Sequence, residues 1–236
     1  MLLLEPGDLA ADGTVRITGR RLAHVRGVLR PEPGRCLRVG LLGGRMGNAR
    51  VAALSDDELV LDPPALVEDP PPRAGIDLLL AVPRPKAVAK LLPAVAALGV
   101  DRVVLLNAAR VEKSYFTAAV LAPDSVGTLL RLGLEQARDT VLPAVLVRPL
   151  FRPFVEDECA RLLTDTALRL VAHPPSAEPC PHRQPGARVA LAIGPEGGWV
   201  PFELELLAAQ GFRPVSLGPR VLRIETVVPL LVGMLR

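Results

Sequence analysis

The stretch that decides the fold spans residues 191–227 and reads LAIGPEGGWVPFELELLAAQGFRPVSLGPRVLRIETV. An apolar strand, expected over 189–193, ends in the loop GPEGG at 194–198. A helix is expected next, and then a short strand over 214–217 with a second loop beginning at Gly218. Glycine lets backbone groups approach a ligand closely, and ligands of open α/β sheets bind beyond the carboxyl ends of strands. The pattern therefore predicts a ligand site built mainly from the backbone of these two loops.

Composition indicates a globular protein with an aliphatic core. The chain has 236 residues, of which 50% are hydrophobic and only 3% aromatic, enough for one large domain or two small ones. No apolar run approaches the ~20 residues that a membrane span needs. The N-terminus, MLLLEPGD, lacks the basic start and long apolar stretch of a signal peptide. We therefore expect a cytoplasmic protein with no membrane partner, and the three widely spaced cysteines fit a reducing compartment.

Basic residues are concentrated near the N-terminus. Between Arg16 and Arg50 there are nine arginines and a single acidic residue, Glu32. Such a stretch in a nearly neutral protein predicts a surface that faces phosphates. A general compositional bias towards arginine is the alternative explanation, because 25 of the 28 basic residues are arginine.

Two domains are predicted, over 1–70 and 75–236, because the pattern changes at the proline-rich linker 69–75. The first part contains short β segments and one helical turn, which are typical of a small barrel. We expect its strands at 15–18, 36–42, 45–54 and 59–66, and its helical turn at 24–29. In the second part strands alternate with helices, which predicts an α/β fold with a parallel sheet covered on both faces. We expect its strands at 76–82, 102–106, 144–147, 167–172, 189–193 and 215–217, and its helices at 86–98, 125–138, 155–163, 202–210 and 225–235.

The IGPEGG loop, the SLG at 216–218, the pair Leu222-Arg223 and the pair Glu225-Thr226 resemble the ribosomal RNA small subunit methyltransferase E family. This family belongs to the SPOUT class of S-adenosylmethionine-dependent RNA methyltransferases. The resemblance implies a SPOUT-type parallel sheet with a C-terminal trefoil knot, preceded by a small PUA-like RNA-binding β-barrel. It also implies a homodimer that methylates N3 of one uridine in 16S ribosomal RNA of the small ribosomal subunit, near the decoding centre.

The resemblance implies which residues bind S-adenosylmethionine. The matching positions are Ala172, His173, Gly194, Pro195, Glu196, Gly197, Gly198, Leu217, Gly218 and Leu222. The alternative is that these glycines only make tight turns and that His173 is a solvated loop residue. Val200 departs from the Ser or Thr that is usual at a helix N-cap, although Pro201 favours a helix start. No metal is expected, because Cys159, Cys180 and His182 include no CxxC pair and lack a fourth ligand.

The catalytic candidates are Glu135, Arg138, Arg223 and Glu225. Residues 135–138 match the family's EQ-x-R element, which in that family lies beside the methyl-transfer site. Methylation of N3 requires loss of its proton and stabilisation of charge on the base oxygens. Arg138 or Arg223 is a candidate to stabilise the anionic uracil, and Glu225 to accept the proton. The alternatives are a solvated helix end for the first pair, and helix capping with a surface salt bridge for the second.

Two groups of residues are candidates for RNA contact. The segment HVRGVLR resembles an element of the family's first domain and contains His24, Arg26 and Arg30. The loops after the first two strands of the second domain contain Arg84, Lys86, Arg110, Lys113 and Tyr115. The cations are candidates to bind phosphates, and the tyrosine is a candidate to stack on a base. Scattered surface charge is the alternative for each of them.

The amino-acid sequence of residues 83–100 and 107–116 departs from the commoner family pattern, which leaves the target nucleotide open. Two rival functions stay open: a non-catalytic ribosome- or RNA-binding SPOUT protein, and a SPOUT methyltransferase for another RNA nucleotide.

Overall fold

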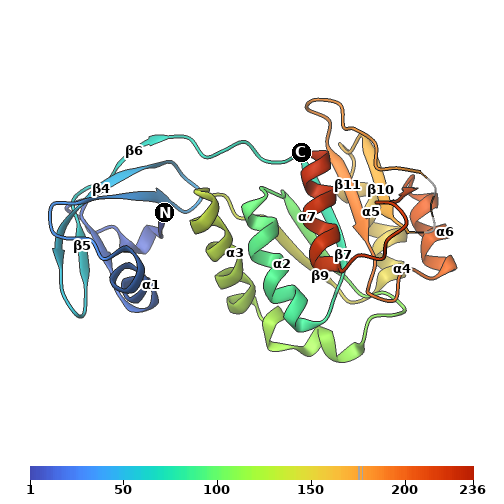
Figure 1. Ribbon diagram of the computed structural model, residues 1–236, viewed down its shortest axis with the longest axis horizontal. Helices are drawn as coiled ribbons and strands as arrows, with labels where there is room; N and C mark the ends of the chain where they lie inside the picture. Colours follow the sequence, from blue (N-terminus) through green and yellow to red (C-terminus); the bar gives the residue numbers. More distant parts are fainter. Residues whose placement is uncertain (175, 177) are drawn as a thin grey trace. The chain divides into compact units, whose positions relative to one another are not determined.

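The computed structural model describes residues 1–174, 176 and 178–236, apart from the side chains of His24, Val28 and Leu29. The chain divides into two compact units (Figure 1). The first contains Met1–Pro72 and Leu134–Leu142, and the second contains Arg73–Gly133 and Pro143–Arg236. None of the described helices is long and apolar enough to cross a membrane.

The first unit is a six-stranded, mainly antiparallel sheet. Its strands are β1 (Leu2–Leu4), β2 (Val15–Ile17), β3 (Cys36–Leu41), β4 (Met46–Leu54), β5 (Leu59–Leu61) and β6 (Ala65–Glu68). They follow the order β1-β3-β4-β5-β2, with β6 paired to β4, and only β1 and β3 are parallel. Apolar side chains that alternate along these strands fill a buried core under helix α1 (Gly19–His24) and η2 (Val25–Leu29).

One strand expectation in this unit is wrong. The single strand expected over 59–66 is two strands, because Pro63 and Pro64 stand between β5 and β6 and proline offers no N–H to a sheet. Strand β1 has no counterpart among the sequence expectations. It pairs with β3, more than thirty residues away, so its neighbours in the sequence carry no signal for it.

Folding neutralises most of the basic stretch between Arg16 and Arg50. Six of its nine arginines lie within 4.0 Å of carboxylates from outside the stretch. The pairs are Arg16–Glu58, Arg21–Asp8, Arg26–Asp56, Arg38–Glu68, Arg45–Asp69 and Arg50–Asp62. The acids that balance this local excess of positive charge lie elsewhere in the sequence, so whether the stretch faces phosphates stays a prediction.

The second unit confirms the predicted α/β class with a parallel sheet. Its strands are β7 (Ile76–Ala81), β8 (Arg102–Leu106), β9 (Ala144–Arg148), β10 (Leu168–Ala172), β11 (Val189–Ile193) and β12 (Arg213–Val215). Their order is β12-β10-β11-β7-β8-β9, and every pairing is parallel. Strands β7 and β11 are buried at every position, as expected of strands covered on both faces.

Helices cover both faces of this sheet. They are α2 (Pro85–Ala97), α3 (Pro123–Ala137), α4 (Phe151–Pro153), α5 (Cys159–Leu162), α6 (Pro201–Ala209) and α7 (Ile224–Leu235), with turns η3 (Lys113–Thr117), η4 (Ala119–Leu121) and η5 (Phe154–Glu158). Helix α2 packs against α7, and α6 packs against η5 (Figure 1). Helix α2 connects β7 to β8, and α6 connects β11 to β12, which is a step in the opposite direction along the sheet. Because crossovers between parallel strands are right-handed, the two helices lie on opposite faces of the sheet.

The ends of three neighbouring strands are level with one another. In the register of the sheet, Ala172 of β10 pairs with both Ile193 of β11 and Val215 of β12. Each is the last residue of its strand. The loops that follow therefore leave the sheet side by side, at its carboxyl edge.

The opposite end of the sheet holds a buried carboxylate. Asp77 is fully buried, and its two oxygens lie 3.1 Å from the Arg188 guanidinium and 3.8 Å from that of Arg102. Burial raises the pKa of Asp77 despite these two arginines, which act in the opposite direction. The charged form is therefore less favourable here than in water.

We expect Asp77 to give the protein an unusual pH dependence. Its pKa in the folded chain lies above the ordinary 3.8. Its contribution to the free energy of unfolding therefore falls as pH rises from 3.8 through the folded pKa. Compared with Asp77→Asn, which does not titrate, the native chain should lose stability as pH rises above about 4, measured by urea unfolding followed by Trp199 fluorescence. Asp165→Asn is the control, because it removes an exposed partner of Arg188. If the free energy of unfolding of the native chain instead rose with pH relative to that of Asp77→Asn, the two arginines would outweigh burial in setting the pKa of Asp77.

Candidate functional site

A cavity of about 330 Å³ lies where β10, β11 and β12 end. Nine of the ten residues that the sequence assigned to cofactor binding line it: Ala172, His173, Gly194, Pro195, Glu196, Gly198, Leu217, Gly218 and Leu222. The tenth, Gly197, lies in the same loop and is not part of the lining. The start of α7 completes the wall with Ile224 and Glu225. Residues more than fifty positions apart in the sequence thus form one site.

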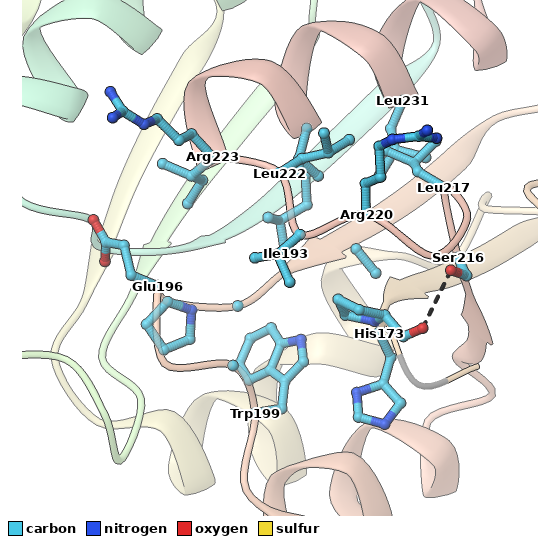
Figure 2. Close-up of a pocket in the computed structure, with 18 of the residues that line it drawn as sticks. His173, Ile193, Glu196, Trp199, Ser216, Leu217, Arg220, Leu222, Arg223 and Leu231 are labelled. Atoms are coloured by element: carbon cyan, nitrogen blue, oxygen red, sulfur yellow. Dashed lines mark hydrogen bonds between the residues drawn. The ribbon is translucent and has the colours of Figure 1, made fainter.

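Backbone contacts fix the loops around this cavity. The His173 N–H donates to the Val215 carbonyl at 2.9 Å, which extends the pairing of β10 and β12 beyond the strands. The Ser216 hydroxyl accepts from the Gly218 N–H at 3.1 Å and lies 3.3 Å from the Pro174 carbonyl (Figure 2). Gly218 has φ +99°, a conformation that favours glycine. Hydrogen bonds at Val215 and Gly218 therefore fix the turn around Leu217 from both sides.

Trp199 forms one wall of the cavity and was not identified from the sequence. It is 95% buried, and its ring centroid lies 5.7 Å from that of Phe151. A Cβ atom at Gly194 would lie 3.0 Å from the indole Cε2 and Nε1 atoms. Glycine at 194 is therefore what lets the indole lie directly against the loop. The only signal in the sequence was a single tryptophan, the residue that follows Gly198.

Charged side chains surround the apolar interior. Figure 2 shows Ile193, Leu222 and Trp199 in the middle, with Glu196 and Arg223 towards one side and Arg220 towards the other. Arg84 also lines the cavity: its guanidinium lies 3.7 Å from Glu225. The Arg84 N–H donates to the Glu196 carboxylate at 3.3 Å. The site thus combines an apolar interior with a rim of both charges.

The EQ-x-R element belongs to the first unit. The Met1 amino group donates to the Glu135 carbonyl at 3.0 Å. Arg138 has φ +56° and directly follows α3, and the Asp139 N–H donates to the Leu134 carbonyl at 3.1 Å. This is the Schellman arrangement, in which glycine usually occupies the left-handed position. An arginine there costs on the order of 1 kcal/mol in backbone strain.

The RNA-contact candidates have different surroundings. Arg26 is paired with Asp56 at 2.5 Å, and Arg30 has φ +43° and donates through Nε to the Gly27 carbonyl. The side chain of His24 lies outside the described part of the structure. Lys86 lies in the first turn of α2.

The other candidates follow β8. Arg110 donates to the Gly197 carbonyl, and Lys113 and Tyr115 lie in η3. Burial, and then the charges of Glu112 and Glu196, raise the pKa of the Tyr115 phenol. Tyr115 is therefore within electrostatic reach of the loop that carries Glu196. Among the described residues no cluster of His, Cys, Asp and Glu could hold a metal ion.

Comparisons with known proteins show the family and the fold. Residues 70–236 match the family model of the RNA methyltransferase domain. The chain is 30% identical over 208 residues to ribosomal RNA small subunit methyltransferase E of Treponema pallidum, which covers 87% of this chain and 78% of that protein.

Two solved structures share the fold over almost the whole chain. One is a Legionella pneumophila protein solved as a methyltransferase with bound cofactor SAM, with a TM-score of 0.74, 24% identity and coverage of 98% of this chain and 95% of that one. The other is ribosomal RNA small subunit methyltransferase E of Neisseria gonorrhoeae bound to S-adenosyl methionine, with a TM-score of 0.75, 20% identity and coverage of 99% and 95%. From the family model and the Treponema relative, the chain belongs to the ribosomal RNA small subunit methyltransferase E family of RNA methyltransferases.

Proposed function

We propose that this chain transfers a methyl group from S-adenosylmethionine to N3 of one uridine in 16S ribosomal RNA, near the decoding centre of the small ribosomal subunit. The observation that carries the proposal is the convergence of nine of the ten sequence-matched cofactor positions on one cavity. The chain's family and the bound cofactor of its structural neighbours support it.

The cavity fits S-adenosylmethionine in size and chemistry. Its volume of about 330 Å³ lies in the range of small-molecule sites. Ile193, Leu217, Leu222 and Trp199 offer an apolar interior to the flat adenine, and the carboxylates and guanidinium groups of the rim suit the charged end of the ligand. When bound, the cofactor supplies a methyl group already activated on a sulfonium.

The chain's own residues must then prepare the uracil. Glu225 lines the cavity at the start of α7 and is our candidate to accept the N3 proton, directly or through water. Arg223 and Arg138 are our candidates to stabilise the charge that develops on the base oxygens. Glu135 would support Arg138 from the same helix end.

Arg84 contributes to this preparation by holding Glu225. The Arg84 guanidinium lies 3.7 Å from the Glu225 carboxylate and orients it towards the cavity. A nearby RNA phosphate would compete with Glu225 for this guanidinium, because arginine binds phosphate well. Arg84 would therefore hold Glu225 in the absence of RNA and could bind an RNA phosphate in its presence.

We further propose the family's architecture for the remaining features. The C-terminal part would form a trefoil knot, and the first unit would act as a PUA-like RNA-binding domain. A homodimer is supported by exposed apolar side chains on α7 and the loop before it: Leu230 is 44%, Met234 42% and Val221 92% exposed. We also expect the protein to act in the cytoplasm, where ribosomal subunits are modified.

The proposal is tested by transfer of labelled methyl to small ribosomal subunits that lack their native modifications, followed by nucleoside analysis. We expect 3-methyluridine at a single site of 16S ribosomal RNA. Methylation of another atom or nucleotide would instead support a related methyltransferase of different specificity. Cofactor binding without any methyl transfer would support a non-catalytic RNA-binding protein.

Gly194→Ala should weaken cofactor binding. The added methyl lies 3.0 Å from the indole of Trp199, so the ring or the loop, both of which line the cavity, must shift. We expect at least a tenfold loss of affinity for S-adenosylhomocysteine, measured as a change in the fluorescence of Trp199, the single tryptophan of the chain. The control is Gly233→Ala, which adds a methyl on α7 with no atom within 4 Å. Gly186→Ala is unsuitable as a control because Gly186 has φ +76°. Unchanged affinity in Gly194→Ala would place the ligand elsewhere.

Arg138→Gly separates catalysis from stability. Glycine relieves the strain at φ +56°, so the variant should unfold at the same temperature as the native chain or slightly above it. Loss of the guanidinium should still lower methyl transfer by about 100-fold while S-adenosylhomocysteine binding stays intact. Arg138→Lys, which keeps a charge, should retain part of the activity. Full turnover by Arg138→Gly would rule out an electrostatic role for this arginine.

A further inference from the structure

A buried carboxylate links the cofactor loop to the loop after β8. Glu203 is only 3% exposed, and each of its two oxygens accepts an N–H from a different loop. Oε1 accepts from Ala109 at 2.6 Å, in the loop after β8, and Oε2 accepts from Val200 at 3.0 Å, at the end of the cofactor loop. Both bonds are partly buried, and a carboxylate is a stronger acceptor than a neutral amide oxygen.

The same contact explains how α6 begins without a Ser or Thr cap. Val200 occupies the N-cap position, and its side chain has no oxygen to accept a hydrogen bond. Glu203, three residues later, accepts the Val200 N–H in the manner of half a capping box. Its second oxygen is thereby free to bind Ala109, outside the helix. The carboxylate therefore does more than cap the helix.

A second contact joins the same two loops closer to the cavity. The Arg110 guanidinium donates to the carbonyl of Gly197. A Cβ atom on Gly197 would lie 3.0 Å from Cδ of Arg110, a closer contact than side chains usually make, so glycine favours this approach.

Each loop leads to a different ligand in the proposed function. The loop of Gly194 and Glu196 lines the cavity that we assign to the cofactor. The loop after β8 leads into η3, which carries Lys113 and Tyr115, two of the RNA-contact candidates. A rigid connection between the loops means that order imposed on one is passed to the other.

We propose that Glu203 and Arg110 form a latch through which cofactor binding and RNA binding strengthen each other. The inference rests on the proposed function, and it assigns Glu203 as a positioning residue. Occupation of the cavity orders the cofactor loop, and the latch then holds the loop after β8 in place for RNA. By linkage, RNA must raise the affinity for the cofactor by the same factor.

The test is the ratio of two affinities for S-adenosylhomocysteine, measured by equilibrium dialysis without and with saturating small ribosomal subunits that lack native modifications. For the native chain we expect subunits to tighten binding by a factor of at least about 5, the lower end of typical couplings. Glu203→Gln replaces one acceptor oxygen with an NH₂ group that faces an N–H, so the ratio should fall towards 1. Arg110→Met keeps an unbranched stem but removes the donor, and should lower the ratio as well.

Glu205→Gln is the matched control, because it makes the same change at an exposed position of the same helix. It should keep the native ratio. If the two latch contacts act as one unit, the double variant Glu203→Gln/Arg110→Met should lower the affinity ratio no further than the single variant with the larger effect.

Two results would overturn the latch. One is a native ratio of 1 in a chain that binds S-adenosylhomocysteine and transfers methyl, which leaves the proposed function intact. The other is weaker binding by both variants with an unchanged ratio, as a merely structural role predicts. Failure of the native chain to bind S-adenosylhomocysteine at all would overturn the proposed function, and the latch with it.

Discussion

The site depends on the level ending of three neighbouring parallel strands. Ala172, Ile193 and Val215 are paired in register, so the loops that follow them meet at one edge of the sheet. A shift of one residue in either pairing would turn the loop residues to the other face. Strand β11 is buried on both faces, so its side chains are packed from both sides of the sheet. The sheet thus acts as the rigid base on which the binding loops are arranged.

Small residues and buried polar contacts then give the loops their shape. Glycine at 194 admits the Trp199 indole, glycine at 197 admits the Arg110 side chain, and Gly218 takes a left-handed turn. Ser216 and Glu203 satisfy backbone N–H groups that the turns would otherwise leave unpaired. These contacts therefore favour one arrangement of the loops over its alternatives. Such preorganisation suits an enzyme that aligns an already activated methyl group with its target.

Much of the second unit could be predicted from the sequence, because its signals are local. Strands β8 and β11 have the predicted bounds, since each is a short apolar run limited by turn residues. The glycine loops identified the cavity for the same reason. Contributions from Trp199, Ser216 and Arg220 were missed, because their roles arise only when distant loops converge. The sheet pairing of β1 was equally hidden.

Charge was the least predictable property. The arginines between Arg16 and Arg50 suggested a basic surface, yet most of them pair with acids that lie up to 42 residues away in the sequence. Glu203 is a second example, because its place in the first turn of α6 gives no sign that its carboxylate is buried after folding. Local composition does not reveal which charges meet after folding, whereas apolar periodicity does reveal which faces are buried.

The most direct test of the central claim is a crystal structure of the chain grown with S-adenosylhomocysteine. We expect density for the whole ligand in the cavity between the loop of Gly194 and the loop of Leu217 to Leu222, with the adenine in the apolar interior beside Ile193. Clear density for the ligand at another place on the chain, or an empty cavity at saturating ligand, would contradict it.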